Sequence, residues 1–405
     1  MENILIIGAF DRYNYGDLLF PLIIEKQLST YGIELSFRYF GLVRSDLSGV
    51  GGLPTEGLQD FYKACEEGDS PVHVMVAGGE ALGVTWHSLL ASLNPVFQRI
   101  NRHHVKLSQY VNINSLSKHY LKGRTKLPFA FTKNDFRNVQ TVLLNSLGGS
   151  GLNETAFGKF PHLRTQLKEV DYLAVRDQIT VENLAAQEIQ AELYPDSAIL
   201  MSHFYPLPFL EKHITAQVRE YVASHRGNYV FYQINKKTTV GKEGLMAEQL
   251  DRIFSDDGVQ LCLCPIGKAL NHDDHIALTK VKSLLKSPST YFDADNIWDI
   301  MYLIANAKAY IGTSLHGAIT AMSFEVPHVG LKVEKLNAYL GTWGVKGNDF
   351  AVDFDQLYSQ YQAVTAIPKS VFAKSKNLQF EEIREAFDRM LQVIHARQEV
   401  SQEKV

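Results

Sequence analysis

The chain has 405 residues and a net charge of −4, from 40 basic and 44 acidic side chains. This balance argues against nucleic acid as the main partner. A hydrophobic fraction of 45% with 21% charged residues excludes a disordered chain. The length predicts two or three domains, and three cysteines are too few for a disulfide framework.

The chain contains no apolar run of the length that crosses a bilayer. Its first ten residues, MENILIIGAF, carry an acid at position 2 and no basic segment before the apolar run. We interpret them as a first strand and not as a signal peptide. We therefore expect a cytoplasmic protein, with the inner face of the membrane as the alternative place of action.

In the first half, short apolar runs alternate with amphipathic stretches, which is the pattern of β-α-β units. Strands are predicted at 4–7, 35–43, 73–77, 139–144, 171–175 and 192–194, and helices at 18–28 and 178–188. The rhythm stops near Pro195, Pro206 and Pro208, so we expect a domain boundary there.

The same alternation resumes after residue 228. Strands are predicted at 229–234, 259–264, 309–311 and 328–331, and helices at 243–254, 273–285, 297–305, 316–324 and 380–398. The predicted fold class is α/β, with two Rossmann-like, doubly wound domains that face a cleft. The domains are expected at 1–205 and 206–370, followed by a closing C-terminal helix within 371–405.

Residues 101–138 form a basic insertion that carries eight Lys or Arg and one acid, Asp135. Aromatic residues, among them Tyr110 and Tyr120, are interleaved with these charges. One interpretation is a solvated insertion that packs on the N-terminal domain. The other is a basic lip of the cleft that attracts an anionic substrate.

Two glycine-containing turns follow predicted strands of the first domain. The first holds Asn14, Gly16 and Asp17, where glycine permits close approach of a ligand to the backbone. Turn chemistry alone is the alternative, with Asp17 as a helix N-cap. The second turn is Gly78-Gly79, which leaves N–H groups free for an anion or is a plain strand-to-helix turn.

Arg176 ends the strand predicted at 171–175, at the edge of the sheet where ligands bind. A guanidinium there can hold a phosphate or carboxylate in bidentate fashion. The alternative is a structural ion pair with a neighbouring acid.

The most informative segment follows the strand predicted at 309–311. Thr313, Ser314 and Leu315 lead into a helix whose first turn carries His316. A histidine at the C-terminal edge of a strand, among small residues, suits proton transfer beside a bound phosphate or carboxylate. We predict that His316 is functional.

The segment Asn271–His275 places His272 and His275 three residues apart, as two metal ligands on one helix face would be. Asp273 and Asp274 suit a helix start equally well. Because no further ligand cluster is evident in the sequence, we predict no metal site.

These segments together resemble the polysaccharide pyruvyl transferase family. The resemblance rests on the turn at residues 8–17, Arg176-Asp177, the segment 272–275 and the run from Tyr310 to Ile319, and it extends over about residues 3–345. It implies a GT-B-like fold and transfer of the enolpyruvyl group of phosphoenolpyruvate to sugar hydroxyls, giving a pyruvate ketal and phosphate.

The resemblance implies that His316 is the general acid and that Arg176 binds the donor's anionic groups. It implies no cofactor besides the donor substrate, and a sugar or oligosaccharide acceptor that is free or lipid-linked. Ser314 stands where well-studied members carry Arg. The alternatives are a nucleotide-sugar glycosyltransferase of GT-B type and a catalytically silent glycan-binding relative.

Overall fold

The computed structural model describes residues 2–68, 70–103, 110–268, 270 and 273–402. Within them, the first of two parallel sheets has six strands in the order β2-β1-β5-β6-β7-β8. Its strands are β1 (Glu2–Ile7), β2 (Leu35–Phe40), β5 (Val72–Ala77), β6 (Val139–Leu147), β7 (Tyr172–Val175) and β8 (Glu192–Leu193). A two-stranded antiparallel ribbon, β3 (Ser45–Asp46) and β4 (Pro54–Thr55), lies outside this sheet.

The second parallel sheet has five described strands in the order β11-β10-β9-β12-β13. These are β9 (Tyr229–Gln233), β10 (Gln260–Leu263), β11 (Ser289–Tyr291), β12 (Ala309–Gly312) and β13 (His328–Gly330). In both sheets the strand order reverses beside the first strand, and ligands bind at such a switch point.

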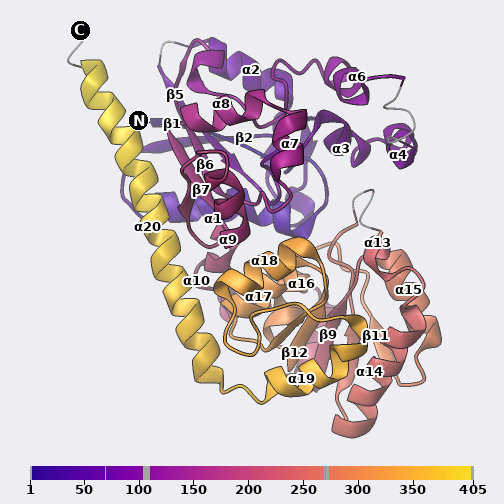
Figure 1. Ribbon diagram of the computed structural model, residues 1–405. Helices are drawn as coiled ribbons and strands as arrows, with labels where there is room; N and C mark the ends of the chain where they lie inside the picture. The colour runs from indigo at the N-terminus through magenta and orange to yellow at the C-terminus, as the bar shows by residue number, and fades with distance from the viewer. Residues whose placement is uncertain (1, 69, 104–109, 269, 271–272, 403–405) are drawn as a thin grey trace.

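Helices surround both sheets, and the two domains are stacked one above the other in Figure 1. The helices associated with the first sheet are α1 (Tyr15–Ser29), α2 (Leu58–Glu66), α3 (Trp86–Ala91), α4 (Pro95–Arg102), α6 (Ile113–Tyr120), α7 (Glu154–Lys159), α8 (His162–Glu169) and α9 (Gln178–Ala185). Those that follow are α10 (Met201–Phe204), α11 (Leu207–His213), α12 (Ala216–His225), α13 (Lys236–Thr239), α14 (Glu243–Asp257), α15 (Asp274–Leu284), α16 (Ile297–Ala305), α17 (Leu315–Ser323), α18 (Glu334–Trp343), α19 (Leu357–Thr365) and α20 (Lys369–Gln402).

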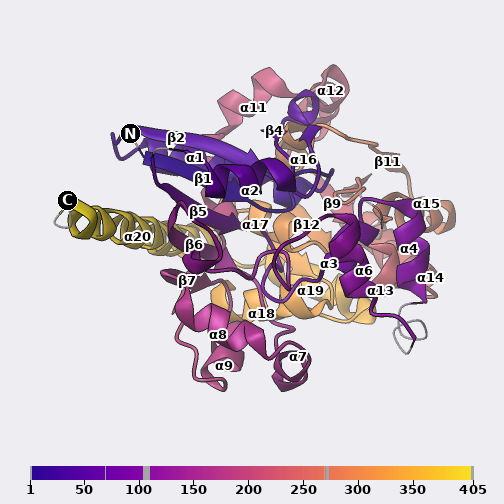
Figure 2. The ribbon, with the colours of Figure 1, turned by 90° about the horizontal axis from the view of Figure 1, so that it is seen from above.

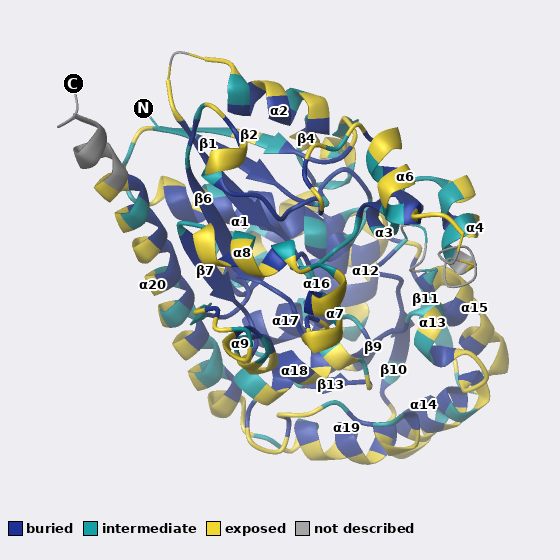
Figure 3. Cartoon of the chain, turned by 45° about the horizontal axis from the view of Figure 1, so that its top comes forward, coloured by how far each residue is buried: buried dark blue, intermediate teal, exposed yellow. Residues whose placement is uncertain are grey.

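The closing helix α20 runs along one side of both domains, as the yellow helix of Figure 1 and its projection in Figure 2 show. It begins at Lys369, eleven residues before the predicted start at Phe380. Three of its apolar side chains, Ile383, Phe387 and Ile394, are fully buried. They belong to one apolar cluster with residues of α1, α16 and α17, so the two domains share a core (Figure 3).

Alternate residues of β1 face opposite sides of the first sheet. Ile4 and Ile6 enter the shared core, whereas Leu5 and Ile7 pack with α2 and α3 on the other face. Burial on both faces explains the continuous apolar run, which is typical of parallel strands. The strand ends at Ile7, and the turn that follows it reaches the second domain, where Asn14 forms a bridge with Gly267.

The proline-rich stretch near residue 206 is helical and not an irregular linker. Pro206 is the N-cap of α11, and Pro208 lies in its first turn. Proline is tolerated there because the first helical N–H groups have no partner within the helix. Of the described helices, none is long and apolar enough to span a membrane.

Candidate functional site

His316 lies in the first turn of α17, directly after β12. Ser314 is the N-cap of this helix, and its hydroxyl accepts a hydrogen bond from Gly317 N at 3.3 Å. The imidazole is 8% exposed and meets Phe20 of α1 edge-on, with ring centroids 5.2 Å apart. The side chain of His316 therefore reaches from the second domain to the first.

Gly16 makes this close approach of α1 and α17 possible. A Cβ at residue 16 would overlap the imidazole of His316 at Nδ1, Cγ and Cε1. Gly16 therefore shapes the site through packing, without exposing a ligand-binding group of its own.

Asp196 bridges the residues that the sequence singles out as catalytic. Its Oδ2 accepts a hydrogen bond from Arg176 Nη1 at 2.7 Å and lies 3.5 Å from His316 Nε2. Burial alone would raise the pKa of Asp196, but His316 and Arg176 together hold it below its ordinary value. The carboxylate thus stays charged while fully buried.

Arg176 is 1% exposed and is bound by two carboxylates. Besides Asp196, its Nη2 donates to Glu80 Oε1 at 2.9 Å. Gly148 makes room for this pair, because a Cβ there would meet both Glu80 Oε1 and Arg176 Nη2. The structure therefore contains a structural ion pair at Arg176, which was the alternative interpretation. Both terminal nitrogens of its guanidinium already have carboxylate partners.

The turns after β1 and β5 meet at the same place. Asn14 Nδ2 donates to Asp17 Oδ2 at 2.6 Å, and Asn14, not Asp17, is the N-cap of α1. A Cβ on Gly79 would lie 3.8 Å from atoms of Arg176, Asp17 and His316, so these three side chains converge on residue 79. Gly78 adopts φ +150°, a region that glycine enters at no steric cost, but it does not line the cavity.

Gln233 and Asp274 support the other wall of the site. Gln233 Oε1 accepts from the backbone N–H groups of Thr313 and Ser314 at 3.2 and 2.9 Å, which removes those two donors from any ligand. Gln233 Nε2 donates to Asp274 Oδ2 at 2.7 Å. Asp274 is 1% exposed, its Oδ1 has no partner among the described residues, and burial raises its pKa to about 6.

Lys335 contributes an ammonium group that makes no ion pair among the described residues. It is the second residue of α18, which follows β13. Burial lowers its pKa, although the carboxylates of Glu80, Asp17 and Asp274 lie close enough to oppose that effect. Because Arg176 is engaged, Lys335 is the cation lining this cavity that has no ion pair within the part of the chain that the structure describes.

These side chains line one small cavity of about 150 Å³ between the domains. It gathers Asn14, Asp17, Gly79, Arg176, Thr313, Ser314 and His316 of the predicted residues. It adds Glu80, Gln233, Asn235, Ile266, Gly267, Asp274 and Lys335. Leu315 is not among them, because its side chain is 1% exposed and belongs to the shared core.

An open cleft of about 760 Å³ adjoins this cavity, and Asn14 and Asp17 line both. Its first-domain wall includes Gln98 and Asn101 of α4. Its second-domain wall includes Lys236 and Lys237 of α13 and Asp273. A small ligand in the cavity and a larger one in the cleft would therefore meet beside Asp17.

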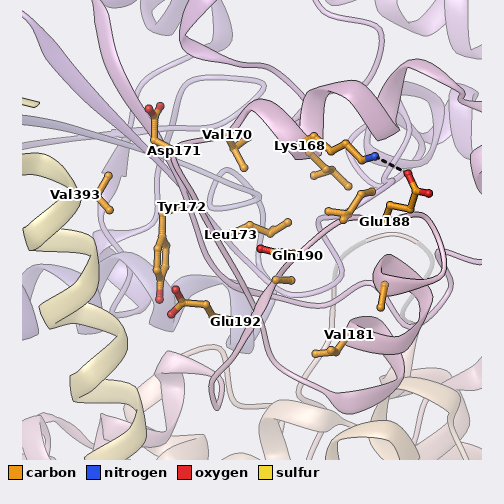
Figure 4. Close-up of a pocket in the computed structure, with 14 residues that line it drawn as sticks. Lys168, Val170, Asp171, Tyr172, Leu173, Val181, Glu188, Gln190, Glu192 and Val393 are labelled. Atoms are coloured by element: carbon orange, nitrogen blue, oxygen red, sulfur yellow. Dashed lines mark hydrogen bonds and ion pairs between the residues drawn. The ribbon is translucent and has the colours of Figure 1, made fainter.

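A wider cavity of about 1040 Å³ lies elsewhere, at the outer edge of the first sheet (Figure 4). Residues of α8, β7, α9 and β8 line it, together with Val393 of α20, and the Lys168–Glu188 ion pair crosses its rim at 3.4 Å. It holds none of the predicted site residues, so its size does not make it the functional site.

The basic insertion only partly borders the cleft. Arg124 pairs with Glu66 of α2 at 2.9 Å and lies over the ring of Tyr62, whereas Lys133 pairs with Asp171. The basic lip therefore stays a prediction, and Lys122, Arg124, Lys126 and Lys133 are not among the residues that line the cleft.

The sequence patterns do not predict several polar residues in or beside the cavity, among them Asp196 and Lys335. His272 lies outside the described residues, and among those described no three His, Cys, Asp or Glu side chains are arranged to hold a metal ion. Asp196 follows Pro195, and that proline was interpreted only as a boundary signal. No pattern in the sequence predicts Lys335 as a site residue, because its position depends on the pairing of β13 with β12.

Comparison with known proteins supports the predicted resemblance. Residues 140–334 match the family model described as polysaccharide pyruvyl transferase, and this span contains Arg176, Asp196, Gln233, Asp274 and His316. Comparison with curated proteins finds no match.

The fold is that of GT-B enzymes, as predicted. UDP-GlcNAc 2-epimerase from Methanocaldococcus jannaschii aligns with a TM-score of 0.57 at 13% identity, over 97% of this chain and 99% of that chain. UDP-N-acetylglucosamine 2-epimerase from Rickettsia bellii aligns with a TM-score of 0.56 at 9% identity, over 98% and 96%. At such low identity, these likenesses concern the fold alone.

Proposed function

From the match of residues 140–334 to the polysaccharide pyruvyl transferase family, we propose that this protein transfers the pyruvyl group of phosphoenolpyruvate to sugar hydroxyls. The observation that carries the proposal is the small cavity around His316 that opens toward a wider cleft. A three-carbon donor suits the cavity, and a sugar chain suits the cleft.

The donor's anionic groups would bind to Lys335 and to the start of α17. The backbone N–H groups of Leu315 and His316 make no hydrogen bond among the described residues. N–H groups at a helix N-terminus favour phosphate or carboxylate, because they carry the positive end of the helix dipole. Lys335 would supply the charge that Ser314 does not.

His316 would act as the general acid. Its proton goes to the methylene carbon of phosphoenolpyruvate, while the oxygen of a sugar hydroxyl forms a bond to C2 and releases its proton. The C2–O bond to phosphate then breaks, and a second hydroxyl of the same sugar bonds to C2 as phosphate leaves. The proton of the first hydroxyl goes to His316 and restores the acid, and the proton of the second hydroxyl leaves with phosphate. The product is a ketal whose methyl group contains the transferred proton, and such acid catalysis contributes about 10² to 10⁴-fold in rate.

Asp196 would be a positioning residue for this step. Its charged Oδ2 lies 3.5 Å from His316 Nε2 and so helps to orient the imidazole. The same oxygen holds Arg176 Nη1, so the two residues are fixed relative to one another across the domain boundary.

Arg176 would take part in donor binding by exchanging partners. Asp196 is fully buried, but the side chain of Glu80 is 33% exposed and is the replaceable one. A carboxylate or phosphate of the donor would compete with Glu80 for Nη2. The carboxylates that remain in the cavity, such as Asp17, are acceptors for sugar hydroxyls.

The test is to incubate the protein with phosphoenolpyruvate and a panel of glycosides, and to measure phosphate release and the mass of the glycosides. The proposal expects phosphate release that depends on one glycoside, which gains a pyruvate ketal. His316→Ala should lower the rate about 10² to 10⁴-fold. Donor binding without phosphate release across the panel would favour a catalytically silent relative. Turnover of a nucleotide sugar instead would favour the glycosyltransferase alternative.

A further inference from the structure

Large apolar side chains are unusually exposed around α4 and α6. Tyr110 is 85% exposed, Val96 62% and Tyr120 58%, with Val111 and Leu116 at about half. Across the cleft, Val240, which follows α13, is 68% exposed. Five of the six most exposed large hydrophobic side chains among the described residues lie in these two places, the other being Leu378 of α20.

The same region is strongly basic. Residues 81–134 contain eight Lys or Arg and no Asp or Glu, in a chain whose net charge is −4. Arg124 and Lys133 are engaged in ion pairs, but Lys118, Lys122 and Lys126 make none among the described residues. Their charge is therefore available to an external anion.

Helix α6 combines buried and exposed side chains. Ile113 and Ser117 are buried, whereas Leu116 and Tyr120, four residues apart, are exposed. The ring of Tyr120 rests on Phe97 of α4, with centroids 5.1 Å apart. The exposed side chains of α4 and α6 are thus held together on ordered helices.

These helices stand at the mouth of the cleft. Gln98 and Asn101 of α4 line one side of it, and Lys236, Lys237 and Val240 line the other. In Figures 1 and 2, α4 and α6 lie on the same side of the molecule as α13, away from α20. We define the cleft-mouth surface as Val96, Leu116, Tyr120, Val240 and the lysines Lys118 and Lys122.

We propose that the cleft-mouth surface docks the protein onto an anionic lipid bilayer. Aliphatic and aromatic side chains would enter the boundary between headgroups and acyl chains, and the lysines would pair with anionic phosphates. An acidic glycan would satisfy the lysines but would leave Val96, Leu116 and Val240 without partners. Docking in this way turns the open cleft toward the membrane surface.

The test is co-sedimentation of the full chain with phosphatidylcholine vesicles, with and without phosphatidylglycerol. The proposal predicts that the protein binds the vesicles only when phosphatidylglycerol is present, and that binding weakens as the salt concentration rises. Leu116→Ser with Tyr120→Ser should lower vesicle affinity at least about tenfold, because both apolar contacts are lost. Lys118→Ser with Lys122→Asn should lower it about fivefold per lysine at low salt, and Asn tolerates the φ of +54° at residue 122.

Matched controls lie on the other side of the molecule. Val371→Ser with Leu378→Ser removes two exposed apolar side chains from α20, and Lys374→Ser removes an exposed lysine from the same helix. Both controls should bind vesicles as the unaltered protein does. All variants should keep the melting temperature of the parent protein, which separates loss of the surface from loss of the fold.

Two results would overturn the proposal. One is the absence of binding to phosphatidylglycerol vesicles. The other is unchanged binding in the Leu116/Tyr120 variant, together with binding to soluble polygalacturonate, which would identify an acidic-polymer surface instead. Because no donor or acceptor is present in this assay, its result is independent of the proposed pyruvyl transfer.

Discussion

Gly16 packs directly against the imidazole of His316, so that a side chain of any size at residue 16 would overlap the ring. The two residues belong to different domains, at the first turns of α1 and α17. The position of the proposed general acid is therefore set by a contact across the domain interface and not by α17 alone.

Gly16→Ala should abolish most of the transfer activity while the protein stays folded. The added methyl group displaces the ring of His316, and small displacements of a reacting group cost about 10²-fold in rate. The measurement is the rate of phosphate release from phosphoenolpyruvate, together with the melting temperature.

Gly244→Ala is the matched control, because Gly244 occupies the same second position in α14 and has open space around it. This change should leave the rate unaltered and stabilise the helix by about 0.5–1 kcal/mol. Equal rates in Gly16→Ala and Gly244→Ala would show that the Gly16–His316 contact does not position the acid.

Glu80→Gln should improve donor binding. The change removes the charge that competes with the donor for Arg176 Nη2, while Asp196 continues to hold Nη1. We expect a lower KM for phosphoenolpyruvate with kcat changed little. A KM that rises would mean that Glu80 itself contacts the donor or orients Arg176 for it.

Asp196→Asn should lower both activity and stability. Removal of one carboxylate from a buried pair costs at most about 3–5 kcal/mol, and Glu80 remains to offset part of this for Arg176. The loss of charge near His316 should also move the alkaline limb of the kcat–pH profile to lower pH, because a general acid acts in its protonated form.

Asp299→Asn provides the comparison for Asp196. Asp299 is also a buried carboxylate, but it accepts hydrogen bonds from the neutral N–H and hydroxyl of Thr215. Its variant should keep the kcat–pH profile of the parent. The same shift of the profile in both variants would contradict a specific role of Asp196.

The raised pKa of Asp274 predicts that the stability of the protein depends on pH. Its pKa of about 6 in the folded protein exceeds the unfolded value of about 3.9, so the folded state binds more protons between these values. Its contribution to stability is therefore full below about pH 4 and is lost as the pH rises through 6. A shift of this size corresponds to about 3 kcal/mol.

Asp274→Asn removes this titration and keeps an acceptor for the N–H groups of Ile266 and Gly267. The free energy of unfolding, measured by denaturant titration at several pH values, should therefore fall less between pH 4 and 7 in the variant than in the parent. Parallel curves for the two proteins would contradict the raised pKa of Asp274.

Most of the fold is predictable from the sequence, because parallel strands buried on both faces produce continuous apolar runs. The run at residues 4–7 and the run at 309–311 both became central strands. The strand β11 has the sequence Ser-Thr-Tyr, which contains no apolar run, and is therefore not predicted in this way. The first part of α20 has weak apolar periodicity and is not predicted either.

The residues of the candidate site are likewise only partly predictable from the sequence. His316, Asn14 and Gly79 stand directly after strands, where the topology brings ligand-binding groups together. Lys335 and Gln233 are ordinary polar residues until the fold places one beside Asp274 and the other under Thr313 and Ser314. Their roles depend on contacts between residues far apart in the chain, which no local pattern indicates.

The most direct test of the account is the binding of phosphoenolpyruvate itself, measured by calorimetric titration of the parent protein, Lys335→Ala and Lys332→Ala. Lys332 is an exposed lysine three residues earlier, paired with Asp353, and serves as the control. The account predicts that phosphoenolpyruvate binds the parent and Lys332→Ala alike, that Lys335→Ala binds at least about tenfold more weakly, and that UDP-GlcNAc does not compete. Binding of UDP-GlcNAc with no binding of phosphoenolpyruvate would contradict it.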